Sequence, residues 1–193
     1  MKSRLLLAVA LLSAAPRLLV SQTAQQWSVQ ASALLVRPSG EAFVDTKSGP
    51  GFELQLRRNS SPWSVGGGVQ YSRHDIGASD PLSLVGIFLE PRFILPFATS
   101  QAAPYASARV AVFQQRLSAS GVTGKATGGQ INAGGGVLLR LSKNANLDVG
   151  ATIGYLKFGE FVIAFPEGGG ITSKAASGTN IVLRAGLALG LGK

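Results

Sequence analysis

The sequence predicts an all-β fold in which eight antiparallel strands close into an up-and-down barrel. Apolar and polar residues alternate in eight segments, and this is a strand pattern because successive side chains leave a pleated strand on opposite faces. The gaps between the segments are rich in turn residues and are alternately long and short. Glycine makes up 25 of the 193 residues without a strict repeat, and hydrophobic residues make up 46%. This composition argues against a disordered chain and against a helical bundle.

The composition also limits the kinds of site that the chain can carry. A length of 193 residues allows one domain of ordinary size. Cysteine is absent and His74 is the one histidine, so we expect no disulfide framework, no metal site and no cofactor. The net charge is +9, but Lys and Arg are scattered and many lie inside strand patterns, so we expect no nucleic-acid partner.

Residues 1–22 have the features of an export signal. Lys2 and Arg4 form a positive start, and residues 5–12 form a short apolar run. That run is far shorter than the roughly 20 residues of a membrane-spanning helix. We expect cleavage between Ser21 and Ala24, which assigns residues 23–193 to the barrel domain.

The first four strands are expected at residues 27–36, 51–57, 63–72 and 82–95. In each of them one parity is mainly apolar, and the other is polar, small or charged. Pro91 lies inside the fourth segment, and proline removes a ladder donor, so we expect a bulge at this point. The apolar parity carries Val29, Ala31, Leu35, Leu54, Leu56, Val65, Val69, Val85, Ile87 and Leu89.

The other four strands are expected at residues 105–114, 129–141, 147–155 and 181–191. The last one is the clearest, because its odd positions are all aliphatic while its even positions are mostly small and include one arginine. The long gaps follow the first, third, fifth and seventh strands, and short turns join the others, as in an up-and-down barrel. The long gaps are residues 37–50, 73–81, 115–128 and 157–179.

A barrel with these strands could be soluble, with its apolar parity inside, or could lie in a membrane, with that parity outside. The charged parity is also rich in Gly, Ala and Ser, as the crowded interior of an eight-stranded barrel requires. A solvated outer face has no reason to avoid long charged side chains. Exposure of an arginine such as Arg109 to lipid would cost about 2–4 kcal/mol. We therefore predict a transmembrane β-barrel with a polar, largely closed lumen.

Aromatic residues are expected where the barrel meets the membrane surfaces. Trp27 and Trp63 open their strands at the same end, which is typical of an aromatic girdle. The opposite girdle is expected to contain Phe52, Tyr71 and Tyr155.

The charged residues of the inner parity are expected to form a polar network in the lumen, where buried charges need partners. Positions around the tight turns predict two pairs in the periplasmic half, Arg140 with Asp148 and Glu90 with Arg109. A gate or ion path is the alternative, but a network that fills the lumen is favoured for eight strands. The predicted members are Glu53, Arg57, Glu90, Arg92, Arg109, Arg140, Asp148 and Arg184.

With these features the chain resembles the OmpA-like and OmpX-like family of small outer-membrane β-barrel domains. The resemblance is carried by residues 89–93 (LEPRF), 104–108 (PYASA) and 134–141 (GGGVLLRL). It implies the outer membrane of a Gram-negative bacterium, insertion by the barrel-assembly machinery and contact with outer-membrane lipids and lipopolysaccharide. We expect a monomer without enzymatic activity and with a structural, adhesive or surface-interaction role.

Two alternatives stay open. A soluble periplasmic lipocalin-like carrier shares the strand number. The second alternative is an outer-membrane lipid-modifying enzyme, which would need a catalytic triad of Ser, His and an acidic residue. The only stretch that brings these residue types together is Ser72 to Asp75, which includes His74. In lipid A deacylase barrels the histidine precedes the serine by two residues, whereas here the order is reversed, so we expect a polar loop.

Residues 158–166 are unusually apolar and are expected to extend a hairpin rather than to form a binding edge.

Overall fold

The structure, a computed structural model, describes residues 25–77, 79–119, 122–164 and 170–191. The expected export signal at residues 1–22 and its cleavage region lie outside these described residues. None of the helices in these ranges is long and apolar enough to cross a membrane.

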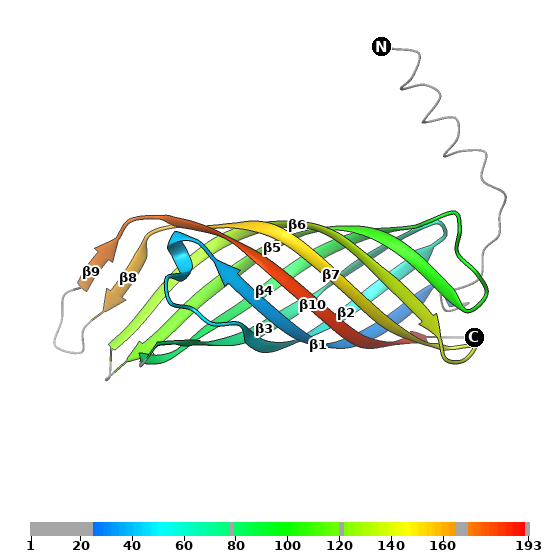
Figure 1. Ribbon diagram of the computed structural model, residues 1–193, viewed down its shortest axis with the longest axis horizontal. Helices are drawn as coiled ribbons and strands as arrows, with labels where there is room; N and C mark the ends of the chain where they lie inside the picture. Colours follow the sequence, from blue (N-terminus) through cyan, green and yellow to red (C-terminus); the bar gives the residue numbers. More distant parts are fainter. Residues whose placement is uncertain (1–24, 78, 120–121, 165–169, 192–193) are drawn as a thin grey trace, which may run out of the picture.

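Eight long antiparallel strands form a closed barrel (Figure 1), which confirms the predicted fold class. Each strand pairs with the next along the chain, and the last pairs with the first from Trp27↔Leu191 to Ser39↔Thr179, so the sheet has no free long edge. The strands are β1 (Trp27–Ser39), β2 (Gly49–Ser60), β3 (Trp63–Ile76), β4 (Ser79–Ile94), β5 (Ala102–Ala119), β6 (Val122–Arg140), β7 (Ala145–Phe158) and β10 (Ala176–Leu191).

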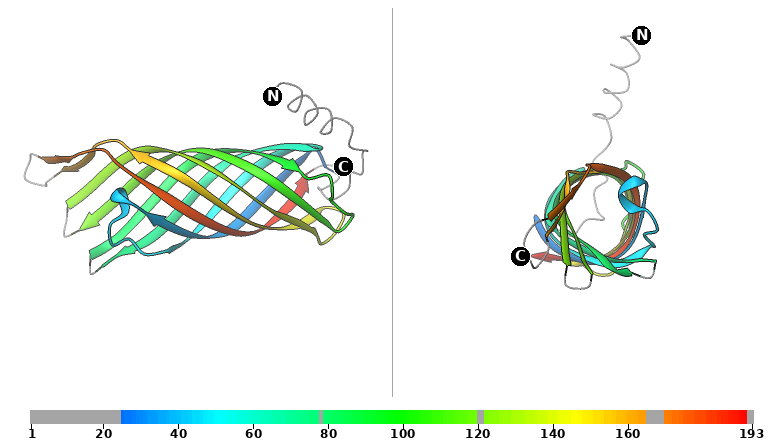
Figure 2. Two further views of the ribbon diagram at one scale, coloured as in Figure 1. Left: turned by 45° about the horizontal axis from the view of Figure 1, so that its top comes forward. Right: turned by 90° about the vertical axis from the view of Figure 1, so that its left-hand side faces the viewer.

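Three short elements lie at one end of the barrel, here called the hairpin end. The hairpin of β8 (Phe161–Ala164) and β9 (Gly170–Ser173) extends the sheet there and pairs with β6. The 3-10 helix η1 (Glu41–Phe43) lies in the connection between β1 and β2. The opposite end, where β1 begins and β10 ends, is called the terminal end (Figure 2). The predicted strand extension is confirmed for residues 161–164, and residues 165–166 lie outside the described ranges.

Two of the predicted long loops are wrong, because the strands continue through them. Paired strand covers most of residues 73–81 and of residues 115–128. Both stretches have few large apolar residues, since the strands leave the apolar belt there and polar side chains then suit the outer face. A composition rich in Ser, Gly, Thr and Gln therefore indicated loops. In the structure the backbone N–H and C=O groups of these residues still form the hydrogen bonds of the β-ladder.

The aliphatic parity faces outward and the charged parity faces inward. Ile87, Ile131 and Ile153 are 64%, 68% and 61% exposed, whereas Glu90 and Asp148 are 0% exposed. A soluble barrel would show the reverse, because an apolar exterior of this extent is stable only against lipid. The structure thus contradicts the lipocalin-like alternative.

Pro91 introduces no bulge, contrary to the prediction. Leu89↔Val110 and Arg92↔Ser107 share one register with β5, and the ladder with β3 runs through Val65↔Pro91 without a shift. The ladder to β5 simply skips two positions, because proline has no N–H to donate there.

Candidate functional site in the barrel lumen

The middle of the lumen holds a charged layer, which is centred on Glu90 of β4. This carboxylate lies among four arginines that come from β2, β4, β5 and β10. Its distances are 3.2 Å to Arg57 Nη2, 2.6 Å to Arg92 Nε, 2.7 Å to Arg109 Nε and 3.0 Å to Arg184 Nη1. The arginines converge because each occupies an inward position on a strand whose register is fixed by the closed ladder.

Glu53 and Asp148 complete the layer on either side of Glu90. Glu53 contacts Arg109 Nη1 at 2.8 Å and Arg184 Nη1 at 3.3 Å. Asp148 contacts Arg92 Nη2 at 2.9 Å and Arg184 Nε at 3.3 Å. The pairs join strands that are far apart in the sequence, so the layer ties the barrel wall together across its interior.

Neutral side chains supply further hydrogen bonds to the layer. The Tyr105 hydroxyl and Gln30 Nε2 each donate to Asp148 at 2.6 Å. Arg109 Nη1 also donates to Gln70 Oε1 at 2.9 Å. Such hydrogen bonds help to stabilise buried charges, whereas Arg57 Nε and Arg92 Nη1 are buried without a hydrogen-bond partner among the described residues.

The four guanidinium groups of the layer face three carboxylates, which leaves one net positive charge. All seven side chains are at most 5% exposed. Arg109 lies 3.9 Å from the centre of the Phe88 ring and Arg92 lies 4.4 Å from that of Tyr105, and these cation–π contacts stabilise the cations. No group of acidic or histidine side chains suited to a metal ion occurs in the described ranges.

An apolar cluster fills the lumen between the charged layer and the hairpin end. The ring of Phe43, carried into the barrel by η1, packs edge-on against Phe158 with centroids 5.8 Å apart. The sequence indicated inward positions for several members, but Phe43 lies in a connection where no periodicity reveals its direction. The buried members are Phe43, Leu82, Leu84, Phe88, Ala111, Phe113, Ala126, Leu156 and Phe158.

The terminal side of the layer is also filled. Ile94, Ala103, Tyr105 and Leu138 form a second buried apolar cluster. A cavity next to Arg57 and Arg92 measures about 10 Å³, about the volume that one water molecule needs.

The predicted lumen residues are brought together with one exception. Glu90 and Arg109 lie opposite each other, as their positions predict. The predicted pairing of Arg140 with Asp148 is wrong, because the β6–β7 register places Arg140 opposite Asn146 and Asp148 opposite Leu138. The turn is centred one residue earlier than the sequence indicated, which shifts the pairing by two residues. Arg140 is half-buried at the end of its strand, where its Nε donates to the Ser142 carbonyl.

The predicted interface aromatics lie on the outer surface. Trp27 and Trp63 are 43% and 55% exposed and begin β1 and β3 at the terminal end. Phe52 and Tyr71 are cross-strand neighbours with centroids 5.5 Å apart, and Tyr155 lies near the hairpin end of β7.

Ser72 and His74 contact each other near the hairpin end of β3. The Ser72 Oγ lies 2.9 Å from His74 Nε2, and His74 Nδ1 lies 3.1 Å from the Lys47 carbonyl oxygen. Because a carbonyl can only accept, Nδ1 donates to it, and Nε2 accepts from the serine hydroxyl in the neutral ring. Both side chains are fully buried in a strand, so the expectation of a polar loop is wrong.

Asp75 cannot complete a triad with this pair, because its side chain leaves β3 on the outer face. His74 lies beyond the apolar belt, since the outward neighbours Arg73 and Asp75 are charged and exposed. Burial lowers the pKa of His74 below its ordinary value, against the opposing effects of the Lys47 carbonyl and Asp75.

Comparison with known proteins relates this architecture to small outer-membrane barrels. Neisserial surface protein A has a TM-score of 0.64 at 17% identity, covering 86% of this chain and 97% of that one. OprG from Pseudomonas aeruginosa has a TM-score of 0.54 at 10% identity, covering 88% and 97%. A major outer membrane protein from Thermus thermophilus has a TM-score of 0.54 at 15% identity, covering 84% and 98%. The sequence itself matches no protein-family model and no curated protein.

The likeness to these structures is one of fold. Together with the apolar exterior and the charged lumen, it defines the class of the protein. The chain is a small eight-stranded β-barrel of the bacterial outer-membrane type.

Proposed function

We propose that this barrel is a non-enzymatic protein that presents its hairpin end at the cell surface for a structural or adhesive role. The observation that carries the proposal is the filled lumen. The charged layer and the apolar cluster occupy its middle and its hairpin end, which opposes a conducting or transporting role.

The orientation follows from the connections. At the terminal end β2 and β3 are joined by two residues, β4 and β5 by seven, and β6 and β7 by four. At the hairpin end the β1–β2 connection, which carries η1, has nine residues, and the β8–β9 hairpin extends beyond the barrel wall (Figure 1), while two residues join β3 to β4 and β5 to β6. Short turns on the periplasmic side and longer outer connections are typical of this class.

An epitope tag inserted between β5 and β6 tests the orientation. We expect an antibody to label intact cells that express the tagged protein. A matched tag between β6 and β7, at the terminal end, should be labelled only after the cells are opened. The reverse pattern would contradict the proposed role at the cell surface.

The partners that we propose follow from the same location. Barrel-assembly machinery would insert the chain, and outer-membrane lipids, including lipopolysaccharide, would surround its apolar belt. A monomer is supported by the closed ladder between β1 and β10, which leaves no long edge for pairing with another copy. Native mass spectrometry in mild detergent should give the monomer mass.

A hydrolase is the second candidate, because the Ser72 hydroxyl lies within hydrogen-bond distance of His74 Nε2. Complete burial of both groups argues against access for a substrate. The lipid A of cells producing the wild type and His74→Ala should therefore be identical by mass spectrometry. A missing acyl chain that depends on His74 would establish the enzyme instead.

A further inference from the structure

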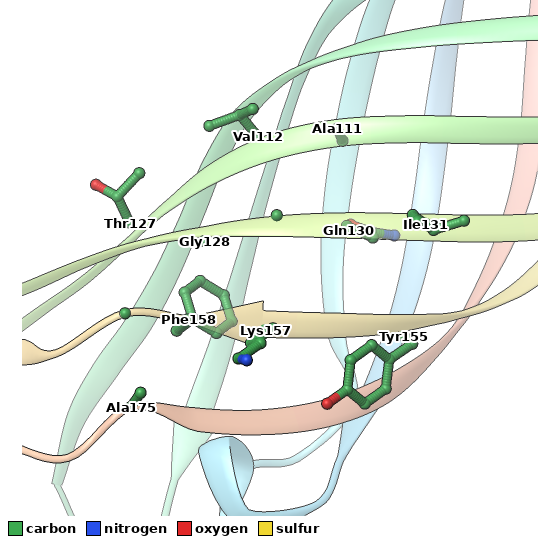
Figure 3. A pocket seen from close by; sticks show the side chains of 12 residues that line it. Ala111, Val112, Thr127, Gly128, Gln130, Ile131, Tyr155, Lys157, Phe158 and Ala175 are labelled. Atoms are coloured by element: carbon green, nitrogen blue, oxygen red, sulfur yellow. The ribbon is translucent and has the colours of Figure 1, made fainter.

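A groove of about 760 Å³ crosses the outer wall of the barrel near the hairpin end (Figure 3). It runs over β5, β6 and β7, from Val112 past Tyr155 to Ala175. Its floor is the β6 backbone at Gly129, which faces outward without a side chain. A Cβ atom added there would meet nothing closer than 4.0 Å. The groove is therefore a gap in the layer of outward side chains, and the pairing of β6 with its neighbouring strands is unbroken there.

The outer face changes from apolar to cationic from the groove toward the hairpin end. On β5 and β6 the outward pairs are Val112↔Gly129 in the groove, then the neutral pair Gln114↔Thr127, and then Arg116↔Lys125 beyond the groove. The first and the last of these pairs are about 13 Å apart along the strands. On the other side of the floor, Lys157 of β7 pairs with Gly129 and is exposed. A hydrophobic chain and an anionic group would thus both find complementary surface.

Arg116 and Lys125 are directly opposite each other, and both side chains are exposed. Two like charges at such positions destabilise a sheet unless an anion lies between them. Arg116 Nε donates to the neutral Gln114 Oε1 at 2.5 Å, and the carboxylates Glu53, Glu90 and Asp148 pair with arginines of the lumen and not with Arg116 or Lys125. The pair therefore favours an external anion.

We propose that this groove binds a phosphorylated glycolipid of the lipid A class. An acyl chain would lie over Gly129, and a phosphate monoester would lie between Arg116 and Lys125, with Lys157 beside the headgroup. A phosphate monoester carries a charge of about −1.5 to −2 and matches two cations better than the single charge of a phosphodiester. The choice of an outer-leaflet lipid rests on the proposed orientation of the hairpin end.

Native mass spectrometry of the purified barrel in mild detergent, titrated with diphosphorylated lipid A, tests the proposal. Replacement of both cations, Arg116→Gln with Lys125→Gln, should weaken binding roughly thirtyfold, because the two cations are expected to contribute about equally to the affinity for an anionic lipid. Gly129→Leu should also weaken binding, because the leucine side chain fills the groove. Phosphatidylglycerol, a phosphodiester, should bind more weakly than lipid A to the wild type.

Two matched controls lie on the outer face of β3, away from the groove. Arg73→Gln removes an exposed outward cation, and Gly67→Leu fills another outward glycine, where an added Cβ meets nothing closer than 3.5 Å. Neither should change lipid A binding. Equal effects of control and groove variants, or unchanged binding in the groove variants, would overturn the site.

Heat-modifiable gel mobility of each variant shows that the barrel is folded. Loss of the lipid site in a folded, surface-labelled barrel leaves the proposed function intact. Failure of surface labelling removes the proposed function, whatever the lipid result.

Discussion

Glu90 shows how much a single buried residue can contribute to the stability of the barrel. Its carboxylate is the shared partner of four arginines, and the other two carboxylates of the layer cannot reach all of them. Removal of one member of a buried ionic group leaves uncompensated charge on the others.

Glu90→Gln should therefore lower the free energy of unfolding by about 3–5 kcal/mol. Urea unfolding in detergent micelles, followed by tryptophan fluorescence, measures this change. Glu160→Gln is the control, because Glu160 is exposed between β7 and β8 and its replacement should change stability by less than about 0.5 kcal/mol. A similar small effect at Glu90 would show that the ionic layer is not stabilising.

His74 makes a residue-scale prediction about pH. Its folded-state pKa lies below its ordinary value of 6.5, so the unfolded chain binds the proton more readily than the folded chain. Stability contributed by the neutral ring is complete above pH 6.5 and is lost as the pH falls from there through the folded-state pKa. The wild type should lose more stability than His74→Gln between pH 8 and pH 5, when both are unfolded in urea. Parallel losses in the two proteins would contradict the burial of a neutral histidine.

At the scale of elements, Phe43 anchors the first part of the connection that carries η1, while Lys47 near its end is hydrogen-bonded to Asp75 and His74 of β3. Phe43 is 4% exposed and packs in the apolar cluster, whereas its neighbour Val44 is 68% exposed. Phe43→Ala should free the connection and increase the rate of tryptic cleavage after Lys47 severalfold, since local opening controls such cleavage. Val44→Ala is the matched control and should leave the rate unchanged. Equal rates in wild type and Phe43→Ala would show that the ring does not hold the connection.

The same scale shows what the sequence could predict. Alternation identified all eight long strands and their inner and outer faces, because exposure to lipid or lumen imposes a period of two on every strand. Prediction from this alternation failed at the strand ends, where the outer face no longer contacts lipid. Beyond the apolar belt both faces tolerate polar residues, so the ends of β5 and β6 were predicted as loops. Register at the β6–β7 turn also escaped prediction, since turn geometry sets it and a shift of one residue in the turn centre moves Arg140 away from Asp148.

Taken as a whole, the molecule is a barrel whose interior is filled in layers, with charge in the middle and apolar side chains on both sides. This arrangement explains why the lumen residues could be predicted as a set, whereas only one of the two predicted pairs, Glu90 with Arg109, is found. Parity decides which side chains enter the lumen, while three-dimensional packing decides which of them meet.

A filled lumen predicts that the intact barrel does not conduct ions. In planar lipid bilayers the wild type should give no discrete current steps. Phe113→Ala with Phe158→Ala removes two rings of the apolar cluster but leaves the charged layer, and it should also remain closed. Stable open channels in the wild type would contradict the closed lumen.

The central claim is that the aliphatic parity faces lipid and the charged parity faces the lumen. The chain has no cysteine, so single cysteines can be placed along β10 and spin-labelled in lipid vesicles. Collisions with lipid-soluble oxygen should be frequent for labels at Leu183 and Leu187 and rare for labels at Val182 and Ala188, which are buried in the structure. Inverted accessibility, or the absence of a period of two along this strand, would contradict the account.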